Sequence, residues 1–396
     1  MYFKYHPDVA LVLAYNKNDG DLKIFLFSPV IAEIRKKSII FVPKFIKAMD
    51  KKRQLLLMCG VSLLTALAVV AIMLPFVLKN QNGQAAVEEQ LEKDTAIHDG
   101  KEYAVVNLSV CNLRQTPNFT AEMSTQALMG MPVKVLAFDT WYQIQTPDDY
   151  TGWVHPVGIW RMTKAEYDAW NKAEKVTVTQ HFGTVYAEAN DQSATVSDVV
   201  AGDRLKLMGK TGSYYQVEFP DGRQGFISEQ TAQPVSEWRK GLKQDAASLI
   251  QTAYTMMGFP YMWAGTSSKG MDCSGYIRNI YYMHDMIIPR DASQMVKVGQ
   301  KIEIAPDYGN IEPGDLIFFG RKATPERKEG VSHVGMYLGN GRFIHSQGNV
   351  HVSSLLPEDE LFDEMNLNRL LYAVRILPYI NKEVGLNTTD KNPYYN

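Results

Sequence analysis

The pattern of apolar and charged positions separates an N-terminal stretch from the rest of the chain. Residues 55–78 form a run of 24 residues without a charge, which at about 1.5 Å per residue is long enough to cross the roughly 30 Å core of a bilayer. Three basic residues stand directly before it at 51–53, and such residues mark the cytoplasmic side of a span. We therefore predict a transmembrane helix or signal anchor over 53–79, after a cytoplasmic or spurious segment over 1–52.

This topology predicts where the protein works. A single-pass inner-membrane anchor would hold the bulk of the chain outside the cytoplasm, in the cell envelope. If the apolar segment is a cleaved signal, the protein is secreted instead. Met49 begins a second plausible start, so the sequence also leaves open whether residues 1–48 are made.

The stretch after the polar linker 80–100 contains an internal repeat. Residues 141–154 align with residues 214–227, and each copy reads as a strand, a Pro-Asp turn and a second strand that opens with Gly and an aromatic residue. An alternating strand precedes each copy. Short strands with turn signals at this spacing indicate small all-β barrels, which we place at 101–165 and 175–235.

The periodicity changes after the repeat. Apolar residues recur at helical spacing over 242–257, and a second helix is expected at 274–284. Buried strands follow, and Asn340-Gly341 is a strong hairpin turn between two of them. The sequence therefore predicts an α+β domain over 240–380 and a C-terminal tail over 381–396. The expected strands are 313–319, 331–338, 342–345 and 371–377.

Composition excludes several classes of function. The 396-residue chain has a net charge of −2, so nothing suggests a nucleic-acid partner. Its three cysteines make no disulfide framework. No zinc-ligand or calcium-loop spacing is present, so no metal or other cofactor is expected. The oligomeric state stays open.

Cys273 is the candidate nucleophile. It stands at the head of the helix expected at 274–284, and Asp272 fits the N-cap position because its carboxylate can accept backbone N–H bonds of the first turn. The positive end of the helix dipole favours thiolate over thiol. The alternatives are a buried structural thiol for Cys273 and a substrate-binding group, instead of a cap, for Asp272.

His333 and His345 flank the predicted hairpin turn. Adjacent antiparallel strands can bring two such imidazoles onto one face, close enough to form a hydrogen bond. One could then act as general base toward Cys273 while the other orients it. These residues indicate a Cys-His-His hydrolase.

The chain also resembles a known family. Its C-terminal part, roughly 240–380, is similar to the NlpC-type cysteine peptidases of bacterial cell walls, and its repeat resembles bacterial SH3-like domains. Together they resemble the γ-D-glutamyl-L-diamino acid endopeptidases of the dipeptidyl-peptidase VI type. The resemblance implies a papain-like catalytic domain behind two SH3-like barrels, and the transmembrane helix predicted from the apolar run would precede them. It rests on Pro-Tyr-Met-Trp-Ala-Gly at 260–265, Asp-Cys-Ser-Gly-Tyr at 272–276, Arg-Asp-Ala-Ser at 290–293, Pro-Gly-Asp-Leu-Ile-Phe at 313–318, Ser-His-Val-Gly-Met-Tyr at 332–337 and Phe-Ile-His at 343–345.

The resemblance also implies roles for single residues. Cys273 would be the nucleophile, His333 the base and His345 the orienting residue, with Tyr261 near the oxyanion. Further residues would line the peptide pocket, namely Trp263, Asp272, Ser274 and Ser293. The first SH3-like domain would hold the substrate amine with an acidic residue and a tyrosine, for which the candidates are Glu122 and Tyr150. Ala264 departs from the family, where glycine is common.

The implied reaction is hydrolysis of the bond between γ-D-glutamate and the diamino acid in peptidoglycan stem peptides that carry a free N-terminal L-alanine. Peptidoglycan-derived peptides would be its partners, together with the membrane through residues 55–78. Two alternatives stay open: an endopeptidase or amidase that acts on polymeric murein, and a non-catalytic cell-wall binding module. The identity of the diamino acid is also open.

Overall fold

The computed structural model describes residues 10–16, 21–27, 97 and 99–396. The chain divides into two compact units, Met1–Val87 and Glu88–Asn396. In the first unit, β1 (Ala10–Asn16) and β2 (Asp21–Phe27) form an antiparallel pair. The predicted membrane segment, 53–79, lies outside the described residues. Within the described part of the chain, no helix is long and apolar enough to cross a membrane.

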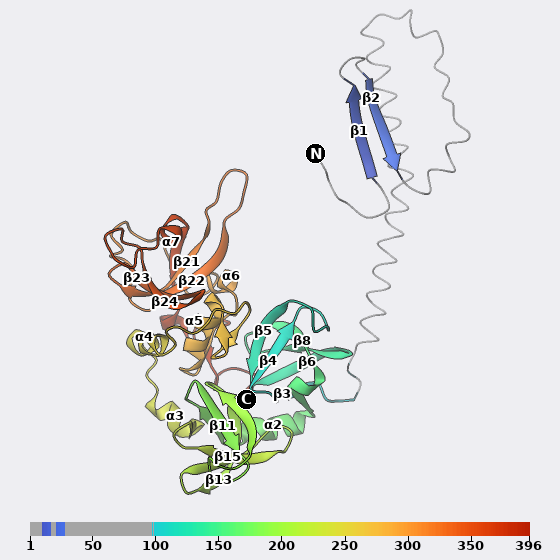
Figure 1. The fold of residues 1–396 in the computed structure, drawn as a ribbon, viewed down its shortest axis with the longest axis vertical. Helices are drawn as coiled ribbons and strands as arrows, with labels where there is room; N and C mark the ends of the chain where they lie inside the picture. Colours follow the sequence, from blue (N-terminus) through green and yellow to red (C-terminus); the bar gives the residue numbers. More distant parts are fainter. Residues whose placement is uncertain (1–9, 17–20, 28–96, 98) are drawn as a thin grey trace, which may run out of the picture. The chain divides into compact units, whose positions relative to one another are not determined.

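The second unit begins with two seven-stranded antiparallel sheets of identical topology (Figure 1). Their strand orders are β5-β4-β8-β7-β6-β3-β9 and β12-β11-β15-β14-β13-β10-β16, so each strand has a counterpart seven numbers later. The aligned repeat forms the β7–β8 and β14–β15 hairpins. The strands of the first sheet are β3 (Tyr103–Val106), β4 (Val110–Arg114), β5 (Met123–Leu128), β6 (Pro132–Asp139), β7 (Trp141–Gln145), β8 (Thr151–Val154) and β9 (Ile159–Met162). Those of the second are β10 (Lys175–Val178), β11 (Phe182–Tyr186), β12 (Thr195–Val200), β13 (Arg204–Thr211), β14 (Tyr214–Glu218), β15 (Gln224–Ser228) and β16 (Ala232–Pro234).

Each sheet buries its own apolar core. Leu113, Val133 and Ile144 lie inside the first sheet together with the thiol of Cys111, while the core of the second consists mainly of valine side chains. The helix α2 (Lys164–Lys172) joins the sheets and begins with a capping box at Thr163. The two sheets also pack against each other, because Val200 of the second sheet belongs to the core of the first and Met129 of the first belongs to the core of the second.

The helix predicted over 242–257 is shorter in the structure, and a further helix that was not predicted precedes it. The helix α3 (Val235–Gly241) ends at Gly241, and α4 (Ala246–Tyr254) begins after Asp245. The Asp245 carboxylate accepts the Ser248 N–H at 2.8 Å, and the Ser248 hydroxyl oxygen accepts the Asp245 N–H. This capping box fixes the start of α4 at Ala246, a boundary that the apolar spacing alone does not reveal.

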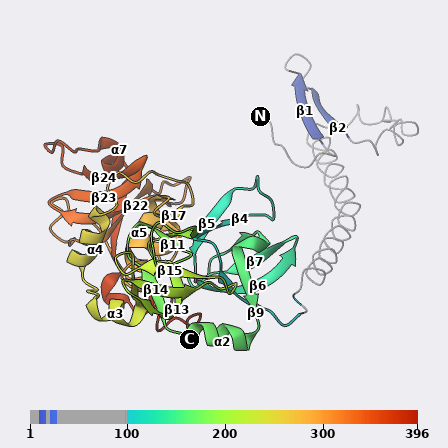
Figure 2. The ribbon, with the colours of Figure 1, turned by 60° about the horizontal axis from the view of Figure 1, so that its bottom comes forward.

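The third region is a six-stranded antiparallel sheet with α5 (Cys273–Tyr282) packed on it (Figure 2). All residues of α5 are buried. Asn340 and Gly341 both have positive φ and form the predicted turn, as a tight hairpin requires. In sheet order, the strands are β20 (Gln300–Ile302), β25 (Leu370–Arg375), β21 (Leu316–Arg321), β22 (Gly330–Gly339), β23 (Arg342–Gln347) and β24 (Asn349–Ser354). Short elements complete it: α6 (Ala292–Met295), α7 (Glu364–Asn368), β17 (Thr266–Ser267), β18 (Gly270–Met271), β19 (Met286–Ile287) and β26 (Asn387–Thr388).

The C-terminal segment ties the three regions together. Its strand β26 pairs with β19, and the Asn392 side chain donates to the Pro147 carbonyl oxygen of the first sheet at 2.9 Å. The buried Arg204 of the second sheet forms an ion pair with Asp285, at 2.8 Å, next to β19. Both sheets are thereby fixed against the domain that carries Cys273.

Candidate active site

Cys273 occupies the first position of α5, directly after its N-cap. The Asp272 Oδ1 atom accepts the Gly275 N–H at 2.6 Å, so Asp272 caps the helix as predicted. A Cβ atom at Gly275 would lie 1.9 Å from the Gly265 carbonyl oxygen. Only glycine fits this close approach, which sets the height of the first turn and therefore of the thiol.

The predicted preference of Cys273 for thiolate is wrong for this structure. Burial, followed by the negative charge of Asp272, raises the pKa of Cys273 to about 11. Backbone N–H groups of Val334 and Ser274 act in the opposite direction but are outweighed. The helix dipole is therefore too weak to ionise a thiol that is only 8% exposed and lies beside a carboxylate. The resting group is a thiol that needs a base.

The structure brings the two histidines of the hairpin into direct contact. His333 Nε2 lies 2.8 Å from His345 Nδ1, and His345 Nε2 lies 3.0 Å from Ser353 Oγ on β24. Both rings are buried. The three side chains form a row that begins at the start of β22 and crosses β23 to β24.

These hydrogen bonds determine which tautomer each histidine must have if His333 is to act as the base. If His333 accepts a proton at Nδ1, its Nε2 carries hydrogen and donates to His345 Nδ1. His345 then carries hydrogen on Nε2 and donates to the Ser353 hydroxyl oxygen. Burial is the main cause that lowers the pKa of His333 to about 3 and that of His345 to about 2. Both rings are thus neutral at rest, and the His333 ring keeps a free nitrogen on which it can accept a proton.

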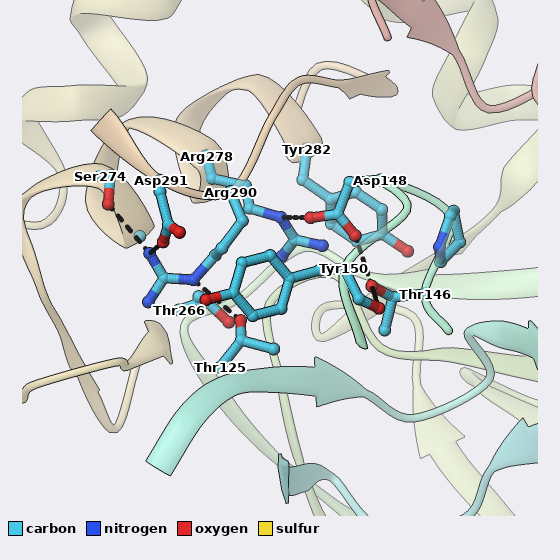
Figure 3. Close-up of polar contacts among 12 residues, drawn as sticks. Thr125, Thr146, Asp148, Tyr150, Thr266, Ser274, Arg278, Tyr282, Arg290 and Asp291 are labelled. Atoms are coloured by element: carbon cyan, nitrogen blue, oxygen red, sulfur yellow. Dashed lines mark hydrogen bonds and ion pairs between the residues drawn. The ribbon is translucent and has the colours of Figure 1, made fainter. Parts of the chain in front are cut away.

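Arg290 joins Asp272 and Ser274 to the first sheet, and Figure 3 shows its side chain between Ser274 and Thr125. Its Nη2 atom lies 2.6 Å from Asp272 Oδ2, its Nη1 donates to Ser274 Oγ at 2.9 Å, and its Nε donates to Thr125 Oγ1 of β5 at 2.8 Å. The Arg290 side chain is 1% exposed. Asp272 is therefore both a cap and an ion-pair partner, and Ser274 is held in the same network.

A second charged pair fixes the loop that carries Tyr150. Asp148 Oδ2 lies 2.8 Å from Arg278 Nε of α5, with side-chain exposures of 1% and 7% (Figure 3). Two residues along, Tyr150 faces Asp291. Burial, the charge of Asp291 and a hydrogen bond with it raise the pKa of Tyr150 to about 12. Burial also raises the pKa of Asp291, although Arg290 opposes this.

The remaining predicted residues lie around Cys273 to different degrees. The Trp263 indole donates to Glu122 Oε1 at 2.8 Å, so Glu122 of the first sheet reaches the catalytic domain. Tyr261 bridges to Met271, two residues before the thiol. Burial, followed by the charge of Cys273, raises the pKa of Tyr261 to about 12. Ser293 lies exposed in α6.

Three further residues belong to this arrangement and were not predicted. Arg290 and Asp291 open the Arg-Asp-Ala-Ser motif at 290–293, and this motif is a signal that could have found them. Ser353 had no such signal, because β24 is not among the predicted strands. Its role depends on a strand pairing that places it beside His345.

Comparison with known proteins agrees with this geometry. Residues 258–365 match the model of the NlpC/P60 family, and residues 113–157 match that of the bacterial dipeptidyl-peptidase SH3 domain. A γ-D-glutamyl-L-lysine dipeptidyl-peptidase of Bacillus cereus is 30% identical over 245 residues, which are 60% of this chain and 71% of that protein. The chain belongs to the NlpC/P60 family.

Other NlpC/P60 relatives span similar lengths. Dipeptidyl-peptidase 6 of Lysinibacillus sphaericus is 28% identical over 65% of this chain and 94% of its own. The crystal structure of an NlpC/P60 family protein from Bacillus cereus has a TM-score of 0.58 at 24% identity, and the match covers 70% of this chain and all of that one. The mixed helix-and-sheet fold and the β-rich region before it are therefore those of this family. The protein is an NlpC/P60 cysteine peptidase that acts on peptidoglycan.

Proposed function

We propose that this enzyme hydrolyses the bond between γ-D-glutamate and the diamino acid of peptidoglycan stem peptides, and that it requires a free N-terminal L-alanine. The observation that carries the proposal is a set of side chains where the first sheet meets the catalytic domain. It consists of Glu122, Tyr150 and Asp291, and we call it the acidic group. Glu122 contacts Trp263 there, and Tyr150 faces Asp291. Carboxylates and a phenol are groups that suit a protonated amine.

The fixed position of this group also supports amine recognition. Asp148, two residues from Tyr150, is held by the buried Arg278 of α5, the helix that starts with Cys273. The amine-binding side chains and the thiol therefore lie at a set separation. When the N-terminal amine of a peptide binds to the acidic group, the γ-carbonyl of its D-glutamate lies at a defined distance from that amine. The fixed separation then brings this carbonyl to the Cys273 thiol.

The steps use residues of this chain alone. The Cys273 sulfur attacks the γ-carbonyl carbon of D-glutamate while its proton passes to His333 Nδ1. The backbone N–H of Cys273, together with Tyr261, stabilises the negative oxygen. His333 then gives the proton to the departing amine, and water, deprotonated by His333, hydrolyses the thioester. His345 and Ser353 keep the His333 ring oriented throughout.

The test compares two substrates on the whole purified chain. One is the free peptide L-Ala-γ-D-Glu-L-Lys, and the other is the same peptide with an acetylated alanine amine. Mass spectrometry of the products should show the free peptide cleaved about 100-fold faster, because acetylation removes charge-assisted bonds that contribute about 1.5–3 kcal/mol each. Equal cleavage of both would refute amine recognition and favour an enzyme that acts on polymeric murein.

A pair of variants makes the test specific to the acidic group. Glu122→Gln and Tyr150→Phe keep the size of each side chain, so we expect a higher KM for the free peptide and a smaller difference between the two substrates. Lys301→Gln changes an exposed charge on β20 and should leave the difference unchanged. Unaltered discrimination in both test variants would remove the first sheet from the proposal.

We also propose that the enzyme works in the cell envelope, held by the predicted anchor at 53–79. Its substrate class is found there, and the basic residues at 51–53 support this orientation. Protease added to intact spheroplasts should digest the catalytic domain. Digestion only after the spheroplasts are lysed would place that domain in the cytoplasm.

A further inference from the structure

Arg369 is a partly buried cation that lacks a carboxylate partner. Its Nε and Nη2 atoms donate to Asn366 Oδ1 at 2.9 and 2.6 Å, and Nη2 also donates to Gln347 Oε1 at 3.1 Å. Both acceptors are neutral amides. Among residues 99–396, no carboxylate oxygen lies within 4.0 Å of this guanidinium. Aspartates lie at 2.6–2.8 Å from other buried or partly buried arginines, namely Arg204, Arg278, Arg290 and Arg375.

This contrast has a physical consequence. Burial is the main cause that lowers the pKa of Arg369, and the charge of Asp363 opposes it without outweighing it. A partly desolvated charge whose hydrogen-bond partners are neutral amides gains from an incoming anion. Planar guanidinium groups bind carboxylates with two parallel hydrogen bonds. The chemistry of this position therefore suits a carboxylate.

The guanidinium lies beside the base. It contacts Phe319 on β21, with Cζ 5.9 Å from the ring centroid, and Gln347 on β23. The strand between them, β22, carries His333, whose ring lies 5.6 Å from that of Phe319. After burial, the charge of Arg369 is the next cause that lowers the pKa of His333. Arg369 thus reaches across the strand of the proton-transfer group.

Arg369 and the acidic group lie on different sides of α5. Arg369 directly follows α7, whereas Glu122 directly precedes β5, and both ribbon views place α7 and β5 on different sides of α5 (Figures 1 and 2). A substrate whose alanine amine is held beside β5 and whose scissile bond lies at Cys273 would direct its other end toward the side of α5 on which Arg369 lies. The part beyond the scissile bond then approaches Arg369.

We propose that Arg369, held by Gln347 and Asn366, binds the α-carboxylate of the diamino acid released by the cleavage. The inference rests on the proposed function, because it assumes this leaving group. That carboxylate is free only when the diamino acid ends the peptide, so Arg369 selects tripeptides over longer stems. The bound carboxylate also offsets a positive charge beside His333, which favours the protonated imidazole that forms during attack.

The experiment compares L-Ala-γ-D-Glu-L-Lys with its C-terminal amide on the whole purified chain. We expect kcat/KM for the acid to exceed that for the amide about 10-fold, as for the loss of one charge-assisted pair. Arg369→Met keeps an apolar side chain over Phe319 but removes the charge, and should bring the ratio to about 1. Because each ratio is taken within one preparation, any unfolded fraction cancels. Arg321→Met, an exposed arginine at the end of β21, should keep the ratio of the unaltered chain.

Two results would overturn the proposal. One is an unchanged acid-to-amide ratio in Arg369→Met. The other concerns a third peptide, in which the D-glutamate α-carboxylate is amidated. If Arg369→Met changes the discrimination against this peptide but not the discrimination against the C-terminal amide, Arg369 binds the glutamate carboxylate instead. The amine test is independent of both. If acetylation still blocks cleavage while acid and amide react equally, only the role of Arg369 fails, and if none of the free peptides is cleaved, the proposed function fails.

Discussion

Replacing Asp148 by alanine should destabilise the second unit of the chain substantially. Asp148 belongs to the first sheet and pairs with Arg278 of α5, 130 residues away in sequence. The aspartate side chain is 1% exposed and that of the arginine 7%. The substitution therefore leaves a guanidinium buried without a counter-ion, in the helix that carries Cys273.

The size of the effect follows from this burial. Removing one partner of a buried ion pair costs about 3–5 kcal/mol, because the remaining charge stays desolvated. Asp148 Oδ1 also accepts the Thr146 hydroxyl at 2.6 Å, and the loss of this bond adds about 1 kcal/mol. Arg278→Met should have a similar cost. The double variant should cost less than the sum of the two by about 2 kcal/mol or more, since no charge is then left unpaired.

Urea denaturation followed by tryptophan fluorescence measures these values. Asp168→Ala is the matched control, because it breaks an exposed ion pair with Lys164 on α2 and should cost at most about 0.5 kcal/mol. A cost below 1 kcal/mol for Asp148→Ala, or additive effects in the double variant, would refute the reasoning. The first sheet would then not depend on this pair for its attachment.

Three other predictions follow from the geometry. Ser353→Ala removes the acceptor of the buried His345 ring, and we expect kcat to fall about 10-fold at unchanged KM, with Ser353→Thr restoring it; unchanged steady-state kinetics would contradict the row of hydrogen bonds. Ala264 has φ +60°, a conformation that costs a non-glycine residue about 1–2 kcal/mol, whereas glycine loses about 0.5–1 kcal/mol in chain entropy; Ala264→Gly should therefore raise the free energy of unfolding by about 0.5–1 kcal/mol, and a lower denaturation midpoint would contradict this. The pKa of His333 is lowered from 6.5 to about 3 and that of His345 to about 2. The stability that the two neutral rings contribute is therefore complete above pH 6.5 and is lost as the pH falls toward 3. His345→Gln should flatten the pH dependence of the denaturation midpoint over that range, and an unaltered slope would contradict buried neutral rings.

Local signals in the sequence predicted the parts of the fold that are locally determined. The Asn340-Gly341 turn and the cap at Asp272 depend on residues a few positions apart, and the structure has both. The same holds for the β7–β8 and β14–β15 hairpins. Apolar spacing placed the start of the helix at 242 instead of Ala246, because the start of α4 is set by the side-chain bonds of Asp245 and not by hydrophobicity.

The site also depends on contacts between residues that are far apart in the sequence, and these cannot be read from local patterns. Residue types and spacing pointed to Cys273, His333 and His345, since a helix start and a hairpin can be read locally. The protonation state of Cys273 was wrong because it depends on burial, which only the packed structure determines. Arg369 went unnoticed because its lack of a carboxylate partner is a property of the whole surroundings.

The most direct test of the central claim is hydrolysis of L-Ala-γ-D-Glu-L-Lys by Cys273→Ala. We predict a loss of activity of about 10⁴-fold or more, because no other group replaces the nucleophile. The matched control is Cys111→Ala, which removes the buried thiol of the first sheet. Burial raises the pKa of this thiol to about 12, so it is not a nucleophile, and the folded variant should retain activity. If Cys273→Ala keeps more than a tenth of the activity of the unaltered chain, Cys273 is not the nucleophile and the account is wrong.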